Sequence, residues 1–406
     1  MTRHSPARRD VLRLATAGSV SVLLAGCASP VRGPAVPVAS VIGASVVGVP
    51  NERFFPSAPG GLEALEREAL QAGERYARSV GVTTRQELPS LNLLSVSGGG
   101  ENGAFGAGLL CGWSDQGTRP PFFLVTGIST GALIAPFAFL GSTYDPVLRK
   151  VYTETSARDI LEARGYLAML YDDALADTAP LFATISRYMD EALLAEIARG
   201  YDQGRLLLIG TSNLDAQLPV IWNIGAIAKS GHPKALDTVR RIMLASASIP
   251  AAFPPVLFDV TVDGQPYQEL HVDGGAFVQA FLYPPAVTRT RRELQAQGRP
   301  VAAVRAYLIR NGRLDPEWAS VDRRVFTIAG RAISTMIWMS GANDVVRLYN
   351  TTERDGVDYN LAFMGSDFNI PLTAPFEQGY MRALFDYGYQ RARRGYDWAK
   401  KPPFGY

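Results

Sequence analysis

The stretch FFLVTGISTGALIAPFAFLG, residues 122–141, decides the fold. An apolar run ends in Gly-Ile-Ser-Thr-Gly and continues into small and apolar residues suited to a helix, a strand–turn–helix pattern typical of α/β proteins. Side chains at Gly127 and Gly131 would clash with the strand and helix in so sharp a turn. Ser129 between them is therefore a candidate nucleophile at a helix N-terminus, with a capping serine in an ordinary turn as the alternative.

A second glycine turn lies upstream, in the stretch LSVSGGGENGAFGAG at residues 94–108. Its spacing satisfies the G-x-G-x-x-G fingerprint of dinucleotide-binding folds. Such a site would need an acidic residue at the end of the next strand, but that strand runs into Gly-Ile-Ser. The N–H groups of Gly98, Gly99 and Gly100 can instead converge on the oxyanion of an acyl-transfer intermediate, so this turn is the predicted oxyanion hole.

The residues alone leave the proton acceptor for Ser129 open. His232 lies in a polar loop, whereas His271 precedes Asp273 by two positions and so shares its face of an expected strand. Asp273 is followed by two glycines, which is also a standard turn signal, as at Asp263 in the same region. A triad with either histidine and a pairing of Ser129 with Asp273 are both compatible with the pattern.

The order G-G-G-x-x-G, G-x-S-x-G and D-G-G resembles the patatin-like phospholipase family. The segments LIGTSNLDAQLPVIWN and ASASIPAAFPPV, the latter at residues 245–256, extend the similarity over about residues 89–310. The resemblance implies a three-layer α/β/α fold with a mainly parallel central sheet and a helical C-terminal tail. The family usually has Asp before the glycines and Arg or Lys between them, whereas this chain has Ser97 and Asn102 there.

The resemblance also implies a mechanism without histidine, cofactor or metal. Ser129 attacks the acyl carbonyl, Asp273 accepts its proton, and the turn at Gly98–Gly100 stabilises the oxyanion. The predicted function is thus a lipid acyl hydrolase, a carboxylic ester hydrolase whose partner is a lipid or ester substrate. A serine esterase using His271 or His232 and a catalytically silent envelope scaffold are the alternatives.

Composition and net charge limit which classes of protein the chain can belong to. The chain has 406 residues, 47% of them hydrophobic, which suffices for a large core. Its formal charge is +2, but the first 26 residues hold four arginines against one aspartate, so the rest of the chain carries −1. This net charge does not indicate a protein that binds nucleic acid through its phosphates, which requires an excess of positive charge.

The N-terminus predicts an export signal. The run LRLATAGSVSVLLAGC, which ends at Cys27, is too short to span a bilayer, and its last four residues resemble the bacterial lipobox, in which the cysteine is lipidated. Arg8 and Arg9 also resemble a twin-arginine signal, so the export route stays open. We expect an exported bacterial lipoprotein of the cell envelope, held by this anchor in the outer rather than the inner membrane. Cys111 is expected to be a buried, inert thiol.

Four segments are expected along the chain. They are a signal peptide at 1–26, a tether and arm at 27–60, an amphipathic helix with its connection at 61–88, and a patatin-like hydrolase domain at 89–400. Within the last segment, residues 155–200 and 320–400 are expected to be mainly helical. The stretch PVLFDVTVDGQPYQELHV is expected to be a hairpin that turns at Asp263-Gly264.

Overall fold

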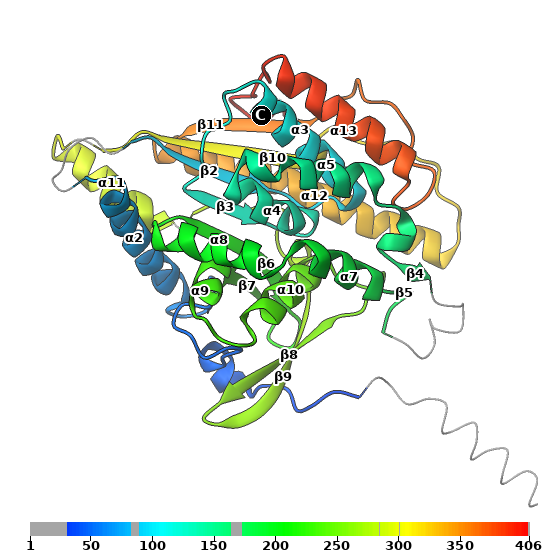
Figure 1. The fold of residues 1–406 in the computed structure, drawn as a ribbon. Helices are drawn as coiled ribbons and strands as arrows, with labels where there is room; N and C mark the ends of the chain where they lie inside the picture. The colour runs from blue at the N-terminus through cyan, green and yellow to red at the C-terminus, as the bar shows by residue number, and fades with distance from the viewer. Residues whose placement is uncertain (1–30, 83–88, 164–172, 284, 300, 405–406) are drawn as a thin grey trace, which may run out of the picture.

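A computed structural model describes residues 31–82, 89–163, 173–283, 285–299 and 301–404 (Figure 1). The predicted signal peptide at 1–26 and the predicted lipidation site Cys27 lie outside these described residues. Within them, every helix is too short or too polar to cross a membrane.

The described chain is organised around one nine-stranded sheet in the order β1-β7-β6-β3-β2-β10-β11, with β9 also paired to β6 and β8 paired to β9. Strands β6, β3, β2, β10 and β11 are parallel, whereas β1, β7, β8 and β9 join through antiparallel pairs. The strands are β1 (Arg53–Phe54), β2 (Leu91–Val96), β3 (Leu124–Gly127), β6 (Leu206–Asn213), β7 (Leu218–Asn223), β8 (Val256–Val262), β9 (Gln265–Asp273), β10 (Val304–Arg313) and β11 (Asp358–Met364). A separate small pair is β4 (Glu162–Ala163) and β5 (Ala176–Asp177).

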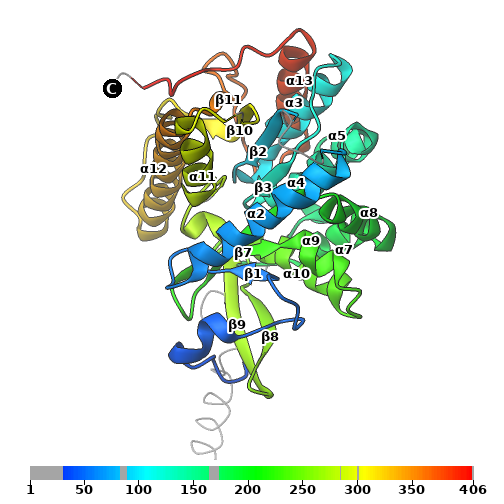
Figure 2. The ribbon, with the colours of Figure 1, turned by 90° about the vertical axis from the view of Figure 1, so that its left-hand side faces the viewer.

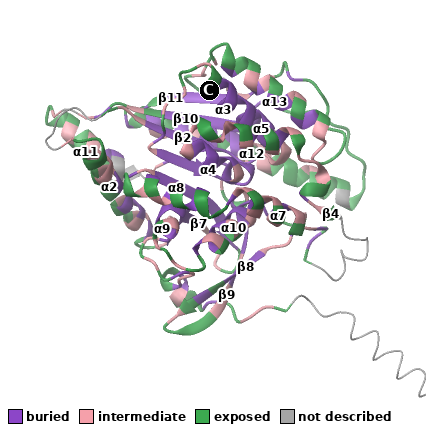
Figure 3. Ribbon diagram, viewed as in Figure 1, coloured by how far each residue is buried: buried purple, intermediate pink, exposed green. Residues whose placement is uncertain are grey.

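Helices cover both faces of this sheet, which gives the predicted three-layer α/β/α fold. Figure 2 shows α11 and α12 on one side of the strands and α3, α4, α5, α8 and α13 on the other. The helices are α2 (Gly61–Ser79), α3 (Gly103–Asp115), α4 (Thr130–Leu140), α5 (Asp145–Glu154), α7 (Ala179–Tyr188), α8 (Glu191–Asp202), α9 (Ile224–Lys229), α10 (Ala235–Ser246), α11 (Pro285–Ala296), α12 (Val325–Arg354) and α13 (Gln378–Arg393). Figure 3 shows the central strands as buried, so groups at their ends stand on a rigid support.

The C-terminal region is mainly helical, as expected, but it also contains a strand that was not expected. Residues 320–400 contain α12 and α13 but also β11, which extends the parallel sheet beside β10, with Leu308 opposite Leu361. Alternating Tyr359, Leu361 and Phe363 carry the period of two that marks a strand, and the first two are buried. The hairpin prediction is confirmed, because β8 and β9 meet at Asp263 and Gly264, both with positive φ.

The arm before α2 is packed on the antiparallel end of the sheet. Its strand β1 pairs with β7, and Ser45 bridges to Thr261 on β8. Arg53 forms a buried ion pair with Glu269 on β9 and also donates to the Ala44 carbonyl. The strand that ends in Asp273 is therefore held by the arm as well as by β6 and β8.

Candidate active site

Ser129 occupies the turn between β3 and α4 in a strained conformation. Its φ is 56° and its ψ −127°, a region that a non-glycine residue enters only when the surrounding structure imposes it. The Ser129 N–H donates to the Ser246 hydroxyl at 3.0 Å, and that hydroxyl donates to the Gly210 carbonyl at 2.7 Å. These two bonds tie the turn to α10 and β6 and help to hold the strain.

Close backbone approach explains the glycines on either side of this serine. A Cβ on Gly127 would lie 2.4 Å from the Gly131 carbonyl oxygen, and one on Gly131 would lie 2.1 Å from the Val96 carbonyl oxygen. Because backbone atoms cannot move aside cheaply, both positions exclude side chains. The serine is thereby set at the N-terminus of α4 with its side chain facing a pocket.

Asp273 ends β9 and is brought to Ser129 by the sheet. Strand β7 occupies one edge of β6, and along the other edge β6 pairs first with β3, Ile209 opposite Gly127, and then with β9, Thr211 opposite Asp273. The Asp273 carboxylate accepts the Gly275 N–H at 2.7 Å and is 4% exposed. Burial raises its pKa to about 7, while hydrogen bonds from the Ser129 hydroxyl and the Gly275 N–H act in the opposite direction.

The glycine turn between β2 and α3 lies directly against the serine. A Cβ on Gly98 would be 2.7 Å from the Gln279 side-chain oxygen and 3.2 Å from the Ser129 Cβ, so a side chain here would crowd both neighbours. The Gly98 N–H, however, donates to the Gln279 carbonyl at 3.1 Å. Among the described residues, the N–H groups of Gly99 and Gly100 have no such acceptor. Of the three predicted oxyanion donors, these two are therefore available to a ligand.

Gly99 and Gly100 exclude other residue types for different physical reasons. A Cβ on Gly99 would lie 2.0 Å from the Asn311 carbonyl oxygen, a severe backbone clash. Gly100 has open space around it but a φ of +56°, which disfavours other residues by conformation alone. Gly100 lines the same pocket as Ser129.

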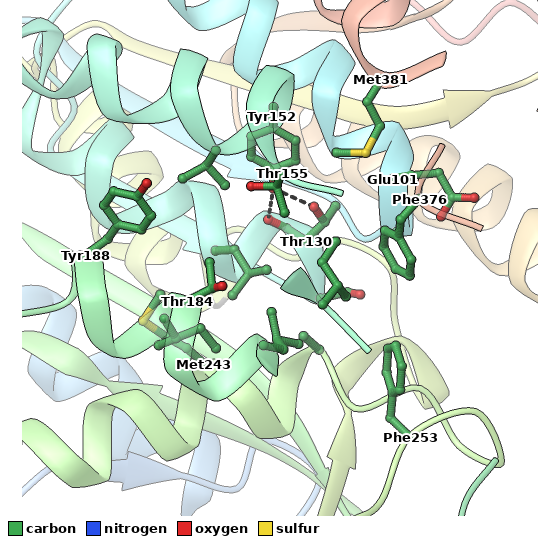
Figure 4. A pocket seen from close by; sticks show the side chains of 18 of the residues that line it. Glu101, Thr130, Tyr152, Thr155, Thr184, Tyr188, Met243, Phe253, Phe376 and Met381 are labelled. Carbon is green, nitrogen blue, oxygen red and sulfur yellow. Dashed lines mark hydrogen bonds between the residues drawn. The ribbon is translucent and has the colours of Figure 1, made fainter. Parts of the chain in front are cut away.

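This pocket is elongated and almost wholly apolar. Figure 4 shows Glu101 and Phe376 towards one end and Tyr188 and Met243 towards the other. It holds about 810 Å³ of empty space, part of it open to solvent. Glu101 is its one charged lining residue within the described chain, and burial raises the pKa of that carboxyl. The apolar walls come from α4, α5, α7 and α10, namely Leu133, Phe137, Val151, Leu181, Ile185 and Met243.

Neither candidate histidine belongs to this pocket. His271 is fully buried, with Nδ1 at 2.9 Å from the Thr211 hydroxyl and Nε2 at 3.1 Å from the Glu269 carboxylate. Burial lowers the pKa of this imidazole. His232 lies between α9 and α10, where its Nδ1 accepts the Lys234 N–H at 3.1 Å.

Other groups with reactive potential are placed away from this chemistry. Cys111 is buried in α3, and burial raises the pKa of its thiol to about 12, so the thiolate is not formed near neutral pH. Within the described ranges, no three His, Cys, Asp or Glu side chains gather closely enough to hold a metal ion.

Sequence reasoning missed the residues behind the glycine turn. Ser97 is buried, and its hydroxyl donates to the Gly98 carbonyl at 2.7 Å while accepting the Asn311 N–H at 2.9 Å. Arg310, also buried, donates to the Gly98 carbonyl at 3.1 Å. The signal available in the sequence was Arg310 and Asn311, which directly follow the apolar run Ala306–Ile309 of β10.

Comparison with known proteins agrees with this geometry. Residues 94–282, which contain Ser129, Asp273 and the glycine turn, match the family model described as patatin-like phospholipase. They form a patatin-like phospholipase domain. A domain of this kind supports lipid acyl hydrolase activity in general, with a lipid as substrate.

The other comparisons add little to the patatin-like assignment. The solved structure of VipD from Legionella pneumophila matches at 12% identity and a TM-score of 0.29, over 79% of this chain and 72% of that one. A likeness this low carries no argument about site or substrate. No curated protein matches the chain.

Proposed function

We propose that the patatin-like domain hydrolyses carboxylic esters of lipids through an acyl-enzyme on Ser129. The observation that carries this proposal is the Ser129 hydroxyl acting as hydrogen-bond donor to the buried Asp273 carboxylate, at the wall of an apolar pocket. Ser129 Oγ forms a bond to the acyl carbon as its proton passes to Asp273. The proton then leaves with the alcohol as the ester bond breaks, and water repeats the sequence to release the acid.

The oxyanion formed in each half-reaction would lie against the glycine turn. The N–H groups of Gly99 and Gly100 supply two donors, and α3 begins directly after the short turn that they open. Because the Gly98 N–H is bound to Gln279, it supports the turn rather than the oxyanion.

The shape of the pocket favours a long acyl chain over a compact acid. Apolar residues line it on several sides, and a cavity of this kind gains free energy for every methylene that it removes from water. We therefore infer that the acyl group lies between α4, α7 and α10, with the leaving alcohol directed outwards.

Labelling with a fluorophosphonate probe tests this proposal. The unaltered protein should be labelled, Ser129→Ala should not, and Asp273→Asn should be labelled far more slowly because the proton acceptor is gone. Ser230→Ala is the control and should be labelled like the unaltered protein, since that hydroxyl donates to the Ile227 carbonyl at the end of α9, away from Ser129. A protein that stays unlabelled when correctly folded would instead favour the silent scaffold.

We further propose that the mature protein starts at an acylated Cys27 and that this lipid holds it in the cell envelope, in the outer rather than the inner membrane. The proposal rests on the lipobox-like sequence Leu24–Cys27. Radioactive palmitate should label the unaltered protein and Cys111→Ser equally, since Cys111 is a buried thiol in α3. Cys27→Ser should lose the label, and a variant that kept it would disprove this anchor.

A further inference from the structure

Arg310 places a positive charge behind the glycine turn. It stands near the end of β10, 5% exposed, and its guanidinium donates to the Gly98 carbonyl at 3.1 Å and reaches the Ser97 hydroxyl at 3.3 Å. Burial lowers its pKa to about 10, so the group stays charged at neutral pH. Among the described residues no carboxylate forms an ion pair with it, and Asp344 on α12 acts on it only at longer range.

The fold makes room for this cation at some cost. A Cβ on Gly341 of α12 would lie 2.6 Å from the Arg310 Cζ, and one on Gly312 would lie 3.3 Å away. The guanidinium is thus packed between two glycines, and its Nε has no hydrogen-bond partner. Burying a charge without a direct counter-ion is expensive, so a chain that does so needs the charge for something else.

The peptide between Gly98 and Gly99 shows what the charge acts on. Its carbonyl accepts hydrogen bonds from both Arg310 and the Ser97 hydroxyl. A trans peptide is planar, and its N–H points opposite to its carbonyl. Fixing the carbonyl towards Arg310 therefore directs the Gly99 N–H away from Arg310. The positively charged guanidinium that is hydrogen-bonded to this oxygen also withdraws electron density from the amide, which makes the Gly99 N–H a stronger donor.

A second brace holds the preceding peptide. Asp344 accepts the Gln279 N–H at 2.6 Å and the Ala280 N–H at 3.1 Å, and the Gln279 carbonyl accepts the Gly98 N–H. Both sides of Gly98 are thus fixed by elements distant in sequence. The turn does not have to reorganise when charge develops on a ligand.

We propose that Arg310 is a positioning residue for catalysis, which orients and polarises the 98–99 peptide so that the Gly99 N–H stabilises the oxyanion. The proposal rests on the proposed function, because it assigns a role within that oxyanion site. Residues 97–103 of the turn itself carry no cationic side chain. In this chain the cation reaches the turn from behind, through the backbone.

Steady-state kinetics and an oxyanion-forming inhibitor test the proposal on the full chain. Arg310→Met should lower kcat by about 10-fold to 100-fold with KM little changed, less than the loss of an entire oxyanion donor. Ser129 Oγ adds to the carbonyl carbon of an alkyl trifluoromethyl ketone and forms a hemiketal oxyanion, while the serine proton passes to Asp273. Its affinity should fall by the same factor, while affinity for the matched methyl ketone, which fills the pocket without an adduct, should not change.

Two further variants separate positioning from folding. Arg205 is half-buried and donates to the Phe122 and Phe139 carbonyls, so Arg205→Met should cost stability while leaving kcat per labelled site unchanged. Arg310→Lys keeps the charge on a single donor nitrogen and should recover part of kcat; it decides the question if Arg310→Met does not fold. Unchanged kcat and ketone affinity in the Arg310 variants would overturn this inference alone. An unaltered protein that forms no adduct would overturn the proposed function with it.

Discussion

Asp273 is an acid whose environment favours the form that cannot react. Burial holds its pKa near 7, yet in the proposed mechanism only the carboxylate can accept a proton from Ser129. The Gly275 N–H and the serine hydroxyl offset part of the desolvation, which keeps the carboxylate accessible near neutral pH. The residue combines a raised pKa with reach to a nucleophile, a combination typical of catalytic groups.

The first prediction concerns pH. The rate kcat/KM should fall about tenfold per unit as the pH drops below about 7, because Asp273 becomes protonated there. An imidazole would titrate in the same range, so the profile does not by itself separate an aspartate base from a histidine base. His271→Gln should keep both the rate per folded molecule and the acid limb. If that variant is as inactive as Ser129→Ala, the histidine triad is the correct mechanism.

The second prediction concerns stability. The pKa of Asp273 is raised on folding from an ordinary value of 3.8 to about 7, so the native state binds more protons than the unfolded chain between these pH values. Stability contributed by the neutral form is therefore lost as pH rises through this window. Asp273→Asn should be more stable than the unaltered protein at pH 8, by up to a few kcal/mol, and by much less at pH 4. Denaturant titrations at the two pH values measure this difference, and an equal effect at both would contradict it.

At the scale of single residues, some groups of the candidate site could be predicted from a local sequence pattern and others could not. The glycines around Ser129 and the Asp-Gly-Gly turn leave local signatures, because each needs a backbone that few residues adopt. The hydrogen bond from the Gly98 N–H could not be predicted from the nearby sequence, because its acceptor, the Gln279 carbonyl, lies far along the chain. Arg310 is likewise 212 positions from the carbonyl it contacts.

Among the secondary-structure elements, α12 connects the back of the sheet to the site. Asp344 and Gly341 on its middle turns meet Gln279 and Arg310, whereas Val325, Ile328 and Met336 near its start are exposed. The helix therefore supports the turn through only part of its length.

The third prediction compares two glycines of this helix. Gly341→Ala places a methyl group 2.6 Å from the Arg310 Cζ and should lower kcat about as much as Arg310→Met, although alanine is the better helix former. Gly330→Ala meets no atom within 4 Å and should stabilise the helix by about 0.5–1 kcal/mol without a change in rate. Thermal melts and kinetics on the pair check this. Equal rates in both variants would show that the contact is unimportant.

The elements themselves were largely predictable. Apolar runs bounded by glycine turns marked β2, β3, β6 and β10, and Asp263-Gly264 marked the β8–β9 hairpin. Strand β11 was missed because its alternating residues lie between two helices and resemble a helical face when only apolar positions are considered. Its parallel pairing with β10 is a non-local contact that no short stretch specifies.

At the scale of the whole molecule, a buried ion pair between Arg53 and Glu269 joins the N-terminal arm to strand β9. The fourth prediction is that Arg53→Met destabilises the protein by about 3–5 kcal/mol, because Glu269 would remain buried without its cation. Arg32→Met breaks a partly exposed pair with Asp215 and should cost about 0–1 kcal/mol. Denaturant melts give both values. If the two variants are equally stable, the Arg53–Glu269 pair is not what holds the arm to β9.

The order of elements along the chain also sets when activity can arise. Ser129 and Asp273 are 144 positions apart, Arg310 comes later, and the middle of α12 comes later still. A growing chain that has emerged to about residue 300 holds nucleophile and base but neither the cation behind the glycine turn nor the helix that packs on it. Such an intermediate is an incomplete hydrolase. On the proposed function, activity is therefore expected only after β10 and the middle of α12 have been made and have packed behind the glycine turn.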